Sequence, residues 1–114
     1  MITWVRPVLL GIAVATFGVV TTAGAVDVEA AKGLARESNC FKCHGVEKKK
    51  EGPAWKEVAA KYRDKPDAEA TLTKHITTGP KVKFPDGHEE DHTIVKSKNP
   101  DEIKNLVDWI LSLP

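Results

Sequence analysis

The sequence predicts an all-α protein, a single domain of about four helices. Four segments carry apolar residues at the three- and four-residue spacing of one helix face, and polar caps or prolines begin these segments. No segment shows the strict alternation of apolar and polar residues that marks a half-buried strand. The chain has 114 residues, of which 41% are hydrophobic, so it is long enough for one globular domain and no more.

The first 25 residues are predicted to be a secretory signal peptide outside the fold. Arg6 supplies a positive charge, the uncharged run from Val8 to Val20 is mostly apolar, and Ala23-Gly24-Ala25 forms a small-residue cleavage site. The alternative is an uncleaved anchor, because no charge lies between Arg6 and Asp27 and such a stretch could just span a membrane. Cleavage leaves 26–114 as the folded domain, exported to the periplasm without a membrane span.

The first two predicted helices present different faces. One runs from about Val28 to Ser38 after Asp27 as N-cap, and its narrow face consists mostly of small residues, namely Ala31, Leu34, Ala35 and Ser38. Small side chains let another helix approach closely. The second helix opens at Gly52-Pro53, with Pro53 at its first position, and its apolar face consists of Trp55, Val58, Ala59 and Tyr62.

The last two predicted helices are separated by a long polar loop. The third helix follows Pro66 with Asp67 as its cap, ends at Gly79-Pro80, and carries a stripe of Ala68, Leu72 and Ile76. The fourth begins with Asn99 as N-cap, and its apolar face consists of Ile103, Leu106, Val107, Ile110 and Leu111, with Trp109 beside them. Pro100 and Glu102 occupy the first and third helical positions, as in a capping box. A loop as long as 80–98 in so small a domain is usually functional.

The segment Cys40-Phe41-Lys42-Cys43-His44 is the C-x-x-C-H signature of covalent haem attachment. The chemistry needs this spacing, because two thiols one turn apart can reach the two vinyl groups on one edge of the porphyrin. His44 then lies under the ring and can bind the iron as its proximal ligand. One haem c with its iron is therefore the predicted cofactor. It would fill the core of a domain that is too small to bury a large hydrophobic core of its own.

Two other interpretations of the cysteines are weaker. A redox dithiol is expected in a βαβ context, which the sequence does not show. A zinc finger needs a second pair of ligands. The spacing of His88 and His92 comes close to such a pair, but no second C-x-x-C follows.

With these features the chain resembles the small bacterial class I c-type cytochromes over essentially its whole mature length. A helix leads into C-x-x-C-H, a short loop separates His44 from Gly52-Pro53, and the third helix ends at Gly79. The last helix matches through Leu106, Trp109 and Ile110. The resemblance implies the class I fold, in which the first and last helices cross around one covalent haem, and Gly33 or Ala31 would meet Trp109.

The resemblance also implies roles for two residues after the motif. The carbonyl of Pro53 would accept the Nδ1–H of His44, which fixes the tautomer and raises the basicity of the ligand. Trp55 would lie near the haem edge, although packing in the core explains this residue as well.

The sixth iron ligand is where the sequence departs from the family. The usual ligand there is a methionine in the loop before the last helix, but the only methionine is Met1, which is lost with the signal peptide. Counting back from Asn99 favours His92 as the replacement, and counting forward from Gly79 favours His88. We expect His92, with His88 as the first alternative and His75 as the least favoured of the three histidines. An open or water-ligated iron is also considered.

The other interpretations of the loop and helix histidines are structural. His75, beside the stripe of the third helix, is expected to be a partly exposed residue at the helix border. The segment from His88 to His92 could be a solvated acidic loop or, if helical, a weak surface metal site.

The predicted function is that of a periplasmic, non-enzymatic carrier of single electrons, with a bis-histidine haem of low potential. The alternative is a gas-binding sensor or small haem enzyme with an open or displaceable sixth position, and a third option is a docking subunit of a respiratory complex. In the family, lysines near the haem steer the protein to acidic redox partners. The equivalent residues are Lys42, Lys48, Lys49 and Lys50, which a solvated face explains equally well. The net charge of +1 gives no argument for nucleic acid as a partner.

Overall fold

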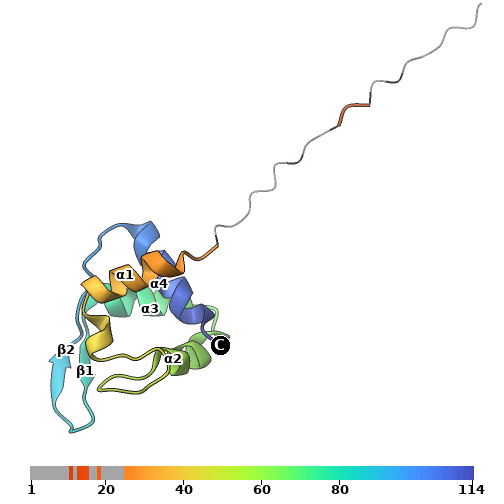
Figure 1. Ribbon diagram of the computed structural model, residues 1–114. Helices are drawn as coiled ribbons and strands as arrows, with labels where there is room; N and C mark the ends of the chain where they lie inside the picture. The colour runs from red at the N-terminus through yellow and green to blue at the C-terminus, as the bar shows by residue number, and fades with distance from the viewer. Residues whose placement is uncertain (1–10, 12, 16–17, 19–24) are drawn as a thin grey trace, which may run out of the picture.

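The computed structural model describes residues 11, 13–15, 18 and 25–114, and it is mostly helical, with one small β-hairpin (Figure 1). The signal peptide predicted for residues 1–25 lies almost wholly outside the described residues, so it stays a prediction. Among the residues that are described, no helix combines the length and the apolar character needed to cross a membrane.

Helices α1 (Val28–Glu37) and α4 (Pro100–Ser112) begin at the predicted caps. The side chain of Asp27 accepts a hydrogen bond from the backbone N–H of Ala30 at 3.0 Å, and Asn99 does the same for Asp101 at 2.9 Å. Glu102 does not close a capping box with Asn99. Its carboxylate accepts from the hydroxyl of Ser97 instead, and the Ser97 oxygen accepts the Asn99 N–H at 3.1 Å.

Helix α2 (Trp55–Tyr62) starts later than predicted, with Ala54 as its N-cap, so the placement of Pro53 at the first helical position was wrong. The reason is that backbone bonds tie this stretch to the C-x-x-C-H segment: the Gly52 N–H donates to the Cys43 carbonyl at 2.8 Å and the Trp55 N–H to the Gly45 carbonyl at 2.9 Å. Helix α3 (Ala68–Thr78) follows Asp67 and ends at Gly79, whose φ of 61° is the left-handed conformation that glycine adopts at little cost.

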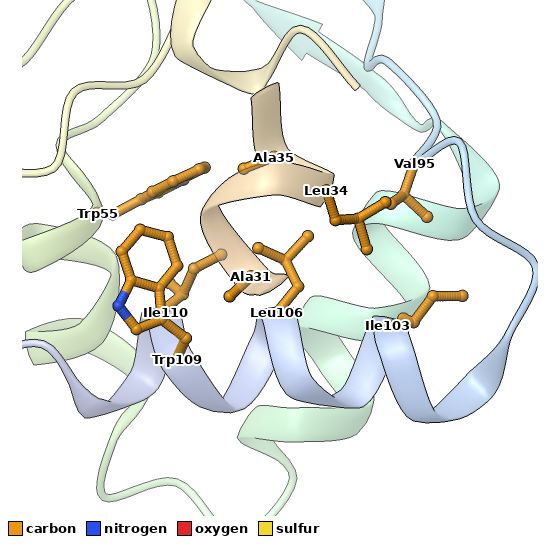
Figure 2. Packing of buried hydrophobic residues seen from close by; sticks show 9 residues of the cluster. All are labelled: Ala31, Leu34, Ala35, Trp55, Val95, Ile103, Leu106, Trp109 and Ile110. Atoms are coloured by element: carbon orange, nitrogen blue, oxygen red, sulfur yellow. The ribbon is translucent and has the colours of Figure 1, made fainter. Parts of the chain in front are cut away.

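The core lies where α1 packs against α4 (Figure 2). Ala31 of α1 lies beside Leu106 and Trp109 of α4, and Ala35 is buried in the same cluster, so small residues meet large ones as the resemblance implied. A Cβ on Gly33 would meet nothing within 4 Å, which leaves Ala31 as the residue packed there. Helices α2 and α3 also pack against α4, so all four helices surround one interior.

The loop between α3 and α4 contains a β-hairpin that the sequence pattern did not predict. Strands β1 (Lys81–Lys83) and β2 (Glu89–Asp91) are antiparallel, and lysines of β1 face acidic residues of β2 in register. Such oppositely charged pairs stabilise the hairpin without any alternation of apolar residues. The turn closes with a bond from the Gly87 N–H to the Phe84 carbonyl at 2.9 Å. The segment from His88 to His92 is therefore not helical, which corrects that alternative.

Candidate cofactor site

The C-x-x-C-H segment folds into one tight turn that opens onto a cavity. Asn39, in the left-handed conformation with φ 59°, leads into a 3₁₀ turn, η1 (Cys40–Lys42), and the His44 N–H donates to the Cys40 carbonyl at 3.0 Å. Both thiols and the His44 ring line the same cavity. Burial raises the pKa of both thiols, and the nearby carboxylate of Glu51 raises that of Cys43 further.

The cavity is large and mostly apolar where it meets the core. Its volume is about 1020 Å³, at the upper end of the range for small-molecule and cofactor sites. Much of its apolar wall comes from α3, α4 and the loop before α4, through Leu72, Ile76, Val95, Leu106, Val107 and Ile110. A space of this size, with two thiols and an imidazole at one side, fits the haem that the motif predicts.

His44 is held in the orientation of a metal ligand. Its Nδ1 lies 2.7 Å from the carbonyl oxygen of Pro53, and because a carbonyl only accepts, Nδ1 carries the proton and Nε2 is left free to bind iron. The ring of Trp55 stacks on it, with centres 5.6 Å apart and planes 21° from parallel. Burial lowers the pKa of His44, an effect that the Pro53 hydrogen bond opposes, so the imidazole is neutral near pH 7.

His92 follows β2 directly and faces His44 in the cavity. The two ring centres are 6.1 Å apart, with 46° between the ring planes. Two imidazoles bound on opposite sides of one metal ion at about 2.0–2.1 Å hold their centres roughly 6–6.5 Å apart. The Nδ1 of His92 donates to the Thr93 carbonyl at 2.8 Å, so its Nε2 is also free.

The backbone at His92 is fixed by the end of α3. The His92 N–H donates to the Pro80 carbonyl at 2.8 Å. A Cβ on Gly79 would come within 2.7 Å of the His92 carbonyl oxygen, so only glycine allows this approach. The sequence marked Gly79 as a helix stop, and the contact with the loop adds a second reason for glycine there.

The other two histidines lie in different places, His75 in the cavity and His88 on the surface. His75, expected at the helix border, lines the cavity, and its ring centre is 4.3 Å from that of His92. Its position three residues after Leu72, beside the stripe of α3, is the signal that could have indicated this. His88 is exposed at the end of the hairpin turn, where its ring stacks on Phe84 and its nitrogens face Asp86 and Glu90. His88 is not among the cavity-lining residues.

The four lysines lie on the side of the attachment segment. Lys42 lines the margin of the cavity, and Lys48, Lys49 and Lys50 are exposed in the following loop. The Lys50 ammonium donates to the Phe41 carbonyl at 2.7 Å, which ties this loop back to the motif. The basic residues are thus close to the two cysteines in space as well as in sequence.

Comparisons with known proteins place the chain beside small c-type cytochromes. The family described as "Cytochrome c" matches residues 28–114. Cytochrome c-552 of Nitrosomonas europaea is 40% identical over 80 residues, 70% of this chain and 75% of that protein, and cytochrome c-551 of Pseudomonas denitrificans is 36% identical over 80 residues, 70% of this chain and 93% of that protein. The crystal structure of the class 1 cytochrome MtoD from Sideroxydans lithotrophicus ES-1 is 68% identical with a TM-score of 0.75, covering 78% of this chain and 98% of that chain.

Proposed function

This chain belongs to the cytochrome c family, and from that premise we propose that it carries single electrons in the periplasm with two histidines as axial ligands. The fold is the class I cytochrome c fold, and the chain is an electron carrier that holds one haem c covalently. When bound, the haem supplies the redox chemistry, while the protein supplies attachment, axial ligands, burial and a surface for partners.

We assign the covalent attachment to Cys40 and Cys43. Each thiol would add its S–H across one vinyl group, with the sulfur bonded to one carbon and the hydrogen to the other, so no oxidant is needed. Support comes from the shared cavity wall of the two thiols and His44. Pro53 would keep the proximal His44 in the correct tautomer, and Trp55, stacked on that ring, would restrict its rotation.

We assign the sixth position to His92, and the observation that carries this is its distance from His44. A separation of 6.1 Å between ring centres suits one metal ion between two imidazoles, and a hydrogen bond at each Nδ1 leaves both Nε2 atoms free. His88 is exposed and paired with acidic residues, which argues for a place outside the site.

The ligand pair has a consequence for the reduction potential. A thioether is a soft ligand that favours ferrous iron, whereas imidazole is a better σ-donor and favours ferric iron. We therefore expect a potential about 0.1–0.3 V below that of methionine-ligated relatives, within the range of roughly 0.8 V that axial ligands span. The partners would then be low-potential proteins, met on the side of Lys42 and the 48–50 lysines.

Absorption and EPR spectra of the wild type and of His92→Ala and His88→Ala variants test the ligand assignment. We expect a low-spin wild type in both oxidation states, without the red charge-transfer band of sulfur-ligated ferric haem. His92→Ala should lose the bis-imidazole EPR signal, and His88→Ala, the matched control, should keep it. A His92→Ala protein with the wild-type signal and potential would refute the assignment. A high-spin ferrous wild type that readily binds carbon monoxide would favour the gas-binding alternative.

A further inference from the structure

His75 occupies the space beside the imidazole of His92. The centres of the two rings are 4.3 Å apart and their planes are tilted by 55°. Both rings line the cavity, although one comes from the last turn of α3 and the other from the residue after β2. This is the shortest ring-to-ring distance among the described aromatic and histidine pairs, so the two imidazoles are in direct contact.

Their relative position is set by backbone bonds between α3 and the loop. The Val95 N–H donates to the Ile76 carbonyl at 2.9 Å, next to His75, and the His92 N–H donates to the Pro80 carbonyl at 2.8 Å. These bonds hold the loop on both sides of the ring contact. His75 therefore presents its ring to His92 from a fixed helix.

His92 needs such a neighbour if its ring plane is to be defined. The torsion that turns an imidazole about its Cβ–Cγ bond has broad minima, so the rotamer alone fixes the plane poorly. The other restraint is the hydrogen bond from Nδ1 to the carbonyl of Thr93, the next residue along an exposed segment. The His75 ring, packed against the imidazole, limits the rotation that the hydrogen bond to Thr93 alone would allow.

We infer that His75 is a positioning residue, which restrains the plane of the His92 imidazole and so the angle between the two axial ring planes. In the structure this angle is 46°. The inference rests on the proposed ligation by His92. The angle between two axial imidazoles determines how the iron d orbitals split, and the g values of the low-spin ferric EPR signal report this splitting directly.

The test is frozen-solution EPR of the ferric holoprotein for the wild type, His75→Ala, His75→Phe and Thr73→Ala. In His75→Ala we expect a signal that stays low-spin, with the largest g value moved by more than the wild-type linewidth or clearly broadened. His75→Phe keeps a flat ring at this position and should restore a narrow signal. Thr73 lies on the same helix but does not line the cavity, so Thr73→Ala should leave the signal unchanged.

Three results would overturn the inference, and they are distinguishable. Unchanged g values and linewidth in His75→Ala would show that His75 does not restrain the ring. A high-spin His75→Ala protein would show that His75 is itself a ligand. A wild type without a bis-imidazole signal would refute the ligation by His92 and this inference with it. If His75→Ala does not give holoprotein, His75→Val removes the ring with less loss of volume, and the same shift is expected.

Discussion

Replacement of Trp109 by alanine tests the helix contact on which the cofactor site is built. The Trp109 side chain is only 4% exposed, packs with Ala31 of α1 in the core, and meets Trp55 edge to face at 5.5 Å between ring centres. Trp55 in turn stacks on His44, so the loss of Trp109 weakens the support behind the proposed proximal ligand.

The expected cost can be worked out from this burial. A buried aromatic side chain removes about 150–250 Å² from water, and at about 25 cal/mol per Å² this corresponds to roughly 4–6 kcal/mol. Alanine retains a small part of that area, and the neighbours relax partly into the space. We therefore expect the free energy of unfolding to fall by about 3–5 kcal/mol.

The assay is a denaturant melt of the holoprotein, followed by helical circular dichroism and by haem absorption so that two-state unfolding can be checked. Ile94→Ala is the matched control, because this large hydrophobic side chain is 54% exposed and its truncation should cost less than about 1 kcal/mol. A loss below about 1 kcal/mol for Trp109→Ala would refute the packing described for α1 and α4.

Three further predictions concern the cofactor and the hairpin. Mass spectrometry should find one haem covalently added to a chain that begins at Val26, and haem that extracts into acidified solvent would contradict the attachment. His92→Met should raise the reduction potential by about 0.1–0.3 V and introduce the red sulfur-to-iron band, as measured by a potentiometric titration; an unchanged potential would count against His92 as ligand. The hydrogen bond that the His88 ring donates to the Asp86 carboxylate raises the pKa of His88, so an NMR titration should place this pKa above the ordinary value near 6.5, and Asp86→Asn should lower it. Because the folded pKa is the higher one, this contact contributes its full stability below the unfolded value and loses it as pH rises through the folded value.

Local sequence signals predicted where α1 and α4 begin and where α3 ends. Asp27 and Asn99 marked the starts of α1 and α4, and Gly79 marked the end of α3, because caps and glycine stops depend on neighbouring residues only. The C-x-x-C-H motif is equally local, and the turn at Cys40 brings the side chains of Cys40, Cys43 and His44 to one cavity.

The remaining features depend on contacts between distant segments. The hairpin is held by pairs such as Lys81 with Asp91, which no periodicity in a single strand reveals. Pro53 lies outside α2 because its stretch bonds to the motif loop. The contact of His75 with His92 joins residues from α3 and the loop, so it follows from tertiary packing and not from either segment alone.

The hairpin can unfold locally while the helical core stays folded. All of β2 is exposed and β1 contains only one partly buried residue, Val82, so few apolar contacts oppose local unfolding there. Opening the hairpin would withdraw His92 while α1 and α4 remain packed around Leu106. Amide protons of the hairpin should therefore exchange with solvent long before those of α4. Withdrawal of His92, the proposed sixth ligand, would then be a subglobal opening with a smaller free energy than global unfolding. The state of the iron would then respond to mild denaturants and to partners that bind the hairpin, under conditions in which the helical core stays native.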